Sequence, residues 1–236
     1  MLTNFTLRPE FNVPLGAPVG DPAQVPGGLA WVRMYQNGMT IVNPDANATT
    51  STSLGLDPYR NVSTNRILAG DISIPPISGI VLVKVAPADL DARRKADLSL
   101  LQQGLEKYYA KYGTYKIAGA GANGNGNGWV AFEGTAGVTY LKSITRALFE
   151  EGFLATSTIK DPDPAQARFG GYMLYLCQTA TSSNYSLSAT LNSPSAEEIS
   201  YAQTGCNATG ANGAYSTYGK NYILTGANGA PNIASY

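Results

Sequence analysis

Apolar residues in the first third of the chain come in short runs that alternate with polar positions. Two runs, residues 31–35 and 39–42, flank Asn37-Gly38. Both of these turn residues tolerate positive φ angles, so the pattern predicts a β-hairpin closed by a type I′ turn at Asn37-Gly38. Further strands are predicted over residues 50–54, 65–68, 71–74 and 79–85. Their regular spacing is typical of an antiparallel β-sandwich.

The apolar period changes near residue 87. Five apolar residues then recur at intervals of three and four, which predicts a helix over residues 89–111 with Gly113 as its C-cap. They are Leu98, Leu101, Leu105, Tyr108 and Tyr112. This switch places a domain boundary between an N-terminal β-sandwich, residues 1–87, and a second module, residues 88–236.

The second module continues with a glycine-rich segment, residues 119–128, which we expect to form a flexible loop. A second helix is predicted over residues 139–153, with Leu141, Ile144, Leu148 and Phe149 on its buried side. Strands are predicted over residues 172–177, 185–191 and 222–224. Two helices and a small antiparallel sheet give this module, and the chain as a whole, an α+β fold class.

Charge excludes some partners. The 236 residues contain 16 Lys plus Arg and 16 Asp plus Glu, so no basic excess favours nucleic acid. Charged residues make up 14% of the chain, against roughly 25% in average domains, while Asn, Ser, Thr, Gly and Tyr are abundant. This composition is typical of secreted proteins and predicts an extracellular or cell-surface location.

The longest apolar run, residues 77–85, falls short of the roughly 20 residues of a membrane helix, so no transmembrane segment is expected.

The only two cysteines are Cys177 and Cys206. A pair with no cysteine left over suits one disulfide in an oxidising compartment, and the alternative is two buried free thiols.

The chain contains no histidine, which removes Ser-His-Asp triads and most zinc sites. We therefore expect no catalytic residues, no enzymatic activity and no cofactor. Asp161 and Asp163 lie in an Asp-Pro-Asp-Pro stretch and could help to hold a calcium ion, although a proline-fixed turn also explains them. The Arg93-Arg94-Lys95 run faces aspartates of the same helix and predicts a solvated, self-neutralised surface.

Two further groups of residues are candidates for a surface function: aromatic side chains that could bind a ligand, and asparagines that could be glycosylated. The 15 tyrosines could form a sugar-binding or partner-binding face, and Trp31 and Tyr35 are the binding candidates in the β module, although such residues also occur half-buried in strands. Five Asn-x-Ser/Thr acceptors are candidates for glycosylation. They are Asn4, Asn47, Asn61, Asn184 and Asn207.

Residues 91–115, DARRKADLSLLQQGLEKYYAKYGTY, resemble the segment of type IV pilins and type II secretion pseudopilins where the N-terminal helix enters the globular head. Residues 140–142, Asp161-Pro162 and residues 184–191 also fit, so the resemblance spans about residues 90–225. It implies a subunit that decorates a filament, with Cys177 and Cys206 as the C-terminal disulfide of pilin heads. The apolar pilin helix and its cleavage motif are not found in this chain. The resemblance therefore implies other pilin-like subunits as partners, including a separate helical pilin chain.

The first module resembles the small β domain that closes certain bacterial glycoside hydrolases. The matching residues are 13–16, 31–33, 35–44, 59–60 and 77–82. Catalysis in those enzymes resides in a preceding barrel, so the resemblance implies a stabilising or docking role. The sequence thus predicts a structural subunit of an extracellular filament or surface assembly. The alternative is a secreted carbohydrate-binding surface protein.

Overall fold

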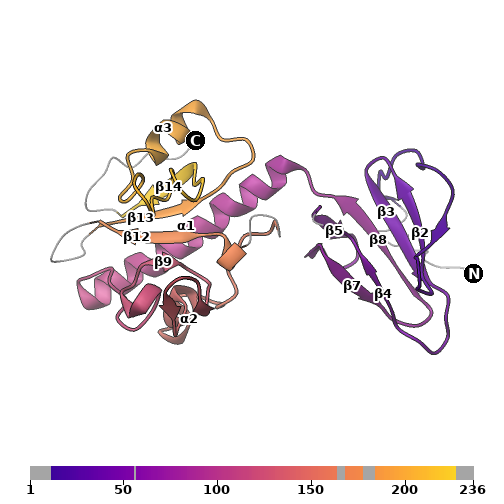
Figure 1. Cartoon of the computed structure of the whole chain (residues 1–236), viewed down its shortest axis with the longest axis horizontal. Helices are drawn as coiled ribbons and strands as arrows, with labels where there is room; N and C mark the ends of the chain where they lie inside the picture. The colour runs from indigo at the N-terminus through magenta and orange to yellow at the C-terminus, as the bar shows by residue number, and fades with distance from the viewer. Residues whose placement is uncertain (1–11, 56, 164–167, 178–183, 227–236) are drawn as a thin grey trace, which may run out of the picture. The chain divides into compact units, whose positions relative to one another are not determined.

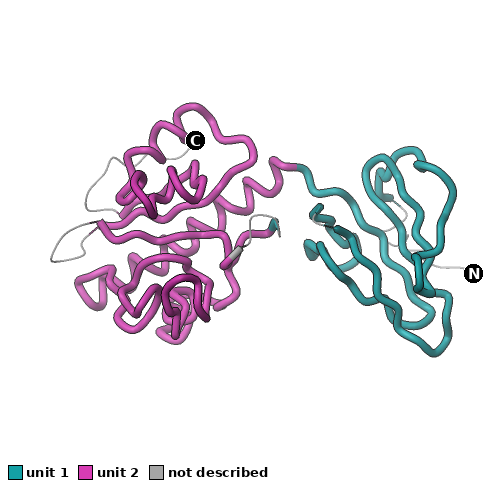
Figure 2. Tube along the Cα trace, in the orientation of Figure 1, with its two compact units in different colours: residues 1–86, 163–165 teal, residues 87–162, 166–236 magenta. Residues whose placement is uncertain are grey.

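Short amphipathic strands and one long helix organise the computed structural model, which describes residues 12–55, 57–163, 168–177 and 184–226 (Figure 1). The chain forms two compact units (Figure 2). Unit 1 consists of residues 1–86 and 163–165, and unit 2 of residues 87–162 and 166–236. Antiparallel sheets occur in both units, and three α-helices lie in the described part of unit 2.

The predicted hairpin of unit 1 forms, but its turn lies one residue earlier than the sequence suggested. Tyr35 pairs with Gly38, so Gln36 and Asn37 make the turn, and neither Asn37 nor Gly38 has a positive φ angle. The type I′ prediction was wrong. Gly38 is required because a Cβ atom there would collide with the carbonyl oxygen of Leu82 on the neighbouring strand.

Unit 1 has a six-stranded antiparallel sheet in the order β1-β2-β3-β8-β5-β6 and a two-stranded sheet of β4 and β7. The bounds are β1 Ala23–Gln24, β2 Trp31–Tyr35, β3 Gly38–Asn43, β4 Thr50–Ser53, β5 Tyr59–Asn61, β6 Ile67–Leu68, β7 Asp71–Ile74 and β8 Ser78–Lys84. Both sheets contribute to one hydrophobic core, in which Ile41 and Leu82 of the larger sheet meet Ile74 of β7. β1 and β5 were not predicted, because both are very short.

Unit 2 is built on helix α1, Pro87–Tyr112, which begins with a proline in its first turn and ends before Gly113 at φ 70°. Leu98, Leu101 and Leu105 are buried as predicted, whereas Tyr112 is 44% exposed. No helix in the described ranges is both long enough and apolar enough to span a membrane.

The leucines of α1 pack on a four-stranded antiparallel sheet in the order β14-β13-β12-β9 (Figure 1). Its strands are β9 Gly128–Trp129, β12 Met173–Leu176, β13 Tyr185–Ala189 and β14 Tyr222–Thr225. The smaller elements are β10 Gly134–Thr135, β11 Thr139–Tyr140, α2 Ile144–Glu150 and α3 Ala196–Ala202. Helix and antiparallel sheet thus share one core, which makes this unit a mixed α and β structure.

The second helix is shorter than predicted. Ser143 accepts a hydrogen bond from the backbone of Arg146 and caps α2, because residues 139–140 before it already pair in a strand. Leu141 therefore lies outside the helix and is 83% exposed, and Phe149 is 45% exposed. The prediction that these two side chains are buried was wrong.

Candidate functional site: a disulfide-closed sheet and two exposed surfaces

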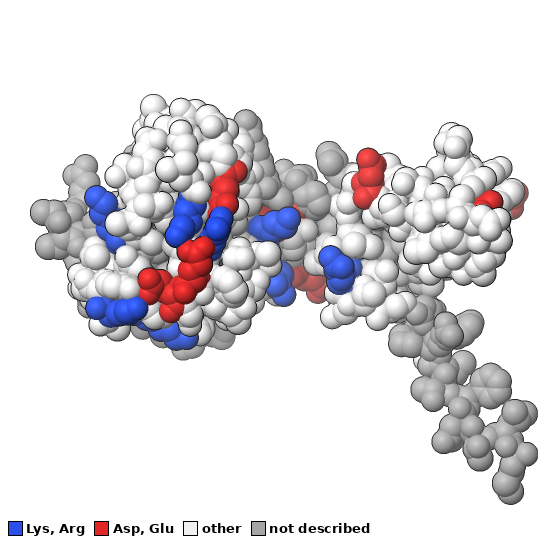
Figure 3. Space-filling view, turned by 90° about the horizontal axis from the view of Figure 1, so that it is seen from below, with Lys and Arg blue, Asp and Glu red and all other residues white. Residues whose placement is uncertain are grey.

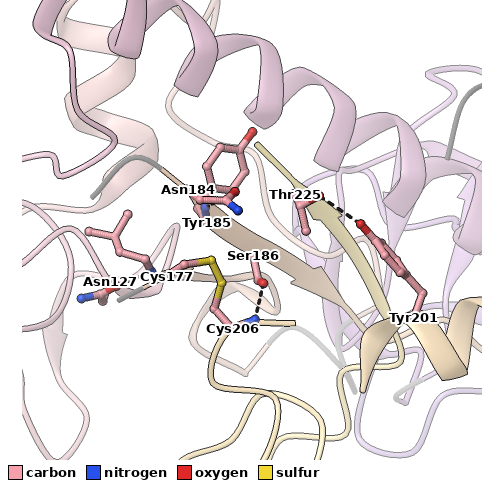
Figure 4. The surroundings of a disulfide bond; sticks show 9 residues. Asn127, Cys177, Asn184, Tyr185, Ser186, Tyr201, Cys206 and Thr225 are labelled. Carbon is pink, nitrogen blue, oxygen red and sulfur yellow. Dashed lines mark hydrogen bonds between the residues drawn. A yellow bond between two sulfur atoms is a disulfide. The ribbon is translucent and has the colours of Figure 1, made fainter. Parts of the chain in front are cut away.

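A disulfide closes the face of the unit 2 sheet that points away from α1. Cys177 follows β12, Cys206 follows α3, and the bond joins them across 29 residues of sequence (Figure 4). The Cys206 amide donates to Ser186 Oγ on β13 at 2.7 Å. A Cβ atom on Gly205 would lie 3.0 Å from Ile223, so this segment rests directly on the sheet.

The glycine-rich segment supports the same end of the sheet. Its backbone folds on itself, with Ala122 N donating to Asn127 O at 2.7 Å. Asn127 Oδ1 in turn accepts from the amide of Leu176 at 2.7 Å, one residue before Cys177. The segment is therefore tied to the sheet by hydrogen bonds, and its Ala120 is buried in the core of unit 2. That the loop is flexible stays a prediction.

The first turns of α1 carry a buried ionic cluster. The Arg94 side chain is fully buried, and its Nε lies 3.0 Å from Asp161 Oδ2. Its Nη1 donates to Asp91 Oδ1 at 2.8 Å. Asp91 also accepts from the amides of Asn192 and Ser193 at 2.8 and 2.9 Å. The prediction of a solvated face was wrong for Arg94, because the partner that buries it is distant in sequence.

Two further charged groups lie inside unit 2. Asp97 is 1% exposed and accepts from the Tyr172 hydroxyl at 3.0 Å, and burial raises the pKa of its carboxyl group. Lys220 is 3% exposed and donates to the carbonyl of Gly171 at 2.6 Å. Burial lowers the pKa of Lys220 to about 8; nearby Asp161 opposes this shift and Arg94 adds to it.

The calcium candidates are Asp161 and Asp163, which are 3% and 9% exposed. Arg94 donates to both carboxylate oxygens of Asp161, so this carboxylate already faces a cation. No group of three or more His, Cys, Asp or Glu side chains in the described residues is placed to hold a metal ion. Calcium binding stays a prediction.

An exposed surface surrounds α2. We call it the α2 surface and define it by exposed Leu141 and Phe149 with the ion pairs beside them. Figure 3 shows basic and acidic side chains side by side on unit 2. The pairs of this surface are Lys142 with Glu150 at 2.7 Å, Arg146 with Glu150 at 2.8 Å, and Arg146 with Glu133 at 3.2 Å. Charge is balanced within it.

A second exposed surface lies on unit 1. Trp31 and Tyr35 stand on the same side of β2, because side chains four residues apart in a strand share a face. Trp31 is 46% exposed, and Tyr35 is half-buried. The two sequence-predicted binding residues are therefore brought to one face of the six-stranded sheet.

The glycosylation candidates differ in access. Asn47 and Asn207 are exposed, and Asn184 is half-buried. Asn61 is 7% exposed, and its Oδ1 accepts from the amides of Ser63 and Thr64, so its amide is not accessible in the folded chain. Asn4 lies outside the described residues.

Comparison with known proteins does not assign this chain to a family. No family model matches this chain, and no curated protein matches it. Among solved structures, a β-galactosidase from Bacillus circulans sp. alkalophilus matches over 30% of this chain, with 16% sequence identity and a TM-score of 0.21. The match covers 10% of the β-galactosidase chain. At this TM-score the likeness establishes neither a fold nor an activity.

Proposed function

We propose that this chain is a structural subunit of an extracellular, pilus-like filament or surface assembly and acts through protein–protein contacts. The proposal rests on the architecture of unit 2. A long helix lies on one face of a four-stranded antiparallel sheet, and a disulfide-pinned segment covers the other face. This arrangement supports the resemblance to pilin heads, and the disulfide suits an oxidising location outside the cytosol.

The contacts would use the α2 surface. Leu141 is 83% exposed, and an apolar side chain this exposed gains free energy when a neighbouring subunit covers it. The flanking ion pairs are mutually neutralised, so a second pilin-like subunit meets no net charge there. The partners that we propose are other pilin-like subunits, among them a separate helical pilin chain.

The test is electron microscopy of filaments sheared from the native cells, with immunogold labelling by antibodies raised against unit 2 and mass spectrometry of the subunits. We expect label along the filaments and peptides of this chain among their subunits. Filaments that contain none of this chain, together with a purified chain that stays monomeric beside a helical pilin, would overturn the proposal.

A second candidate function is carbohydrate binding by unit 1, with no enzymatic activity. The specific observation in its favour is that Trp31 and Tyr35 share one open sheet face. Exposed aromatic rings present flat apolar area at little conformational cost, which suits the apolar face of a sugar ring. A glycan array should give binding that Trp31→Ala and Tyr35→Ala weaken and Tyr112→Ala, in unit 2, preserves. A silent array counts against this function.

A further inference from the structure

The six-stranded sheet of unit 1 has one side turned away from its core, which we call the outer sheet face. Alternation along the strands decides which residues belong to it, since Met39, Ile41 and Leu82 point into the core. Pairing across β2, β3 and β8 then places the others. On these three strands the outer sheet face consists of Trp31, Arg33, Tyr35, Gly38, Thr40, Val42, Gly79, Val81 and Val83.

One row across this face is apolar. Trp31 pairs with Val42, and Val42 pairs with Gly79. Trp31 is 46% exposed and Val42 is 48% exposed, while Gly79 adds no side chain to the row. Trp31 therefore neighbours exposed apolar surface, which suits the apolar face of a sugar ring.

Arg33 lies between the two aromatic residues, and no anionic partner for it is found among the residues that the structure describes. Its guanidinium carbon is 5.8 Å from the centre of the Tyr35 ring. Its Nε is buried and lacks a hydrogen-bond partner within the described chain. A buried donor without an acceptor is costly, and the planar fork of arginine fits a carboxylate with two parallel hydrogen bonds. A carboxylate is therefore an acceptor that suits the Arg33 side chain.

The charge of the other residues on the outer sheet face is compatible with a carboxylate ligand. Its nine residues on β2, β3 and β8 include no Asp or Glu, so Arg33 gives this part of the face a positive charge. An anionic ligand meets no like charge from these strand positions, whereas a neutral ligand supplies no counter-charge to Arg33.

We propose that the outer sheet face binds a polysaccharide that carries carboxylate groups. A sugar ring stacks on Trp31, and a carboxylate of the same chain accepts hydrogen bonds from Arg33. Trp31 and Tyr35 are four residues apart, roughly 13 Å along the strand, so the site extends beyond a single side chain. This inference rests on the second candidate function and adds the class of glycan.

The experiment titrates the full chain with polygalacturonate, with neutral dextran and with polyglutamate, a polyanion that has carboxylates but no sugar rings. Calorimetry gives the affinity. In a Trp129→Phe variant, Trp31 is the only remaining tryptophan, so a change in its fluorescence reports ligand at this face. Trp129 lies in unit 2, 8% exposed, and thermal melting checks that this variant folds.

Arg33→Lys keeps the charge but loses the planar fork, and Arg33→Met loses both. The matched control is Arg66→Met, which removes an exposed charge elsewhere on unit 1. We expect polygalacturonate to change Trp31 fluorescence and to bind about tenfold more weakly to both Arg33 variants and to Trp31→Ala, with Arg66→Met unchanged.

Three outcomes overturn the proposal, and they separate its two parts. Binding of dextran without binding of polygalacturonate excludes the carboxylate as the recognised group and leaves carbohydrate binding as the function of this face. Equal binding of polyglutamate, or equal loss in Arg66→Met, shows a general polyanion surface. If none of the three probes binds, the carboxylate is excluded as the recognised group, and the second candidate function loses its support as well.

Discussion

Arg94 holds the carboxylate of Asp161 inside unit 2, with Nε 3.0 Å from Oδ2, although 67 residues of chain separate them. Neither side chain reaches solvent. Through Asp91, the same guanidinium is linked to the backbone of Asn192 and Ser193. One arginine thus fastens the start of α1 to two distant loops.

Replacing Arg94 should destabilise the fold strongly. Arg94→Met keeps much of the side-chain volume but leaves Asp161 and Asp91 buried without their cation, so we expect a loss of about 3–5 kcal/mol in the free energy of unfolding. Denaturant titration measures it. The control is Arg146→Met, which breaks exposed, solvent-screened ion pairs and should cost far less than Arg94→Met. Equal losses in the two variants would contradict a buried cluster.

Lys220 should give the stability a distinctive pH dependence. Its pKa falls from 10.5 to about 8 on folding, so between these values the unfolded chain holds a proton that the folded chain has lost. The free energy of unfolding contributed by Lys220 therefore rises with pH in this window. We expect wild type to gain on the order of 1–3 kcal/mol relative to Lys220→Met between pH 8 and pH 10. A constant difference between the two proteins would refute this.

Buried tyrosines set the upper limit of the pH range in which the free energy of unfolding rises. Burial raises the pKa of Tyr172 and of Tyr185, so above about pH 10 the unfolded chain loses their protons first and stability falls again. Comparison with Lys220→Met removes this effect, because both proteins carry the same tyrosines.

Loss of the disulfide should act locally and globally. The double variant Cys177→Ser, Cys206→Ser opens a loop of 29 residues, which on the chain-entropy model costs about 3.5 kcal/mol. Hydrogen exchange should accelerate most over residues 203–221, which the bond holds on the sheet, and least in α1. Uniform acceleration across unit 2 would indicate that the bond does not hold this segment separately.

Gly38 and Gly55 offer a matched test of why glycine is needed. Gly38→Ala places a methyl group against the carbonyl of Leu82 and should cost about 3 kcal/mol. Gly55 has φ 72° and open space around it, so Gly55→Ala should cost about 1 kcal/mol from backbone strain alone. Thermal melting ranks them, and the reverse order would show that strand spacing does not depend on Gly38.

Leu141 should matter for assembly and not for folding. Because this side chain is 83% exposed, Leu141→Ser should change the free energy of unfolding by less than about 0.5 kcal/mol. We expect it nevertheless to reduce the amount of this chain in sheared filaments severalfold. Val19→Ser, at an apolar residue of unit 1 that is 58% exposed, is the control and should leave incorporation unchanged. Normal incorporation of Leu141→Ser would exclude the α2 surface as a contact.

Local periodicity was sufficient to predict the hairpin and the long helix. The leucines of α1 recur at helical spacing, and the strands of the hairpin differ from prediction by one residue at most. α3 was missed although its signal was present, since Ser195 and Glu198 form a capping box that the sequence displays. Strands of two residues, such as β9, are set by their neighbours and leave no periodic pattern.

The burial of Arg94 could not be predicted in the same way. A basic residue among aspartates on a helix is usually solvated, and what overrides this preference is Asp161, whose position depends on the folded chain. The exposed Leu141 is the converse case. Its spacing suits a buried helical residue, but pairing of residues 139–140 with β10 ends that register before the helix starts.

The ionic fastening of α1 also has a mechanical consequence. Residues 1–86 of unit 1 continue into unit 2 at Ala86-Pro87, so tension on this N-terminal segment enters unit 2 through the first turn of α1. Asp91 and Arg94 lie within two turns of that point, ahead of the leucines that pack on the sheet. A pull along the helix axis is therefore resisted first by charge-assisted bonds to two separate loops, before the hydrophobic contacts are stretched.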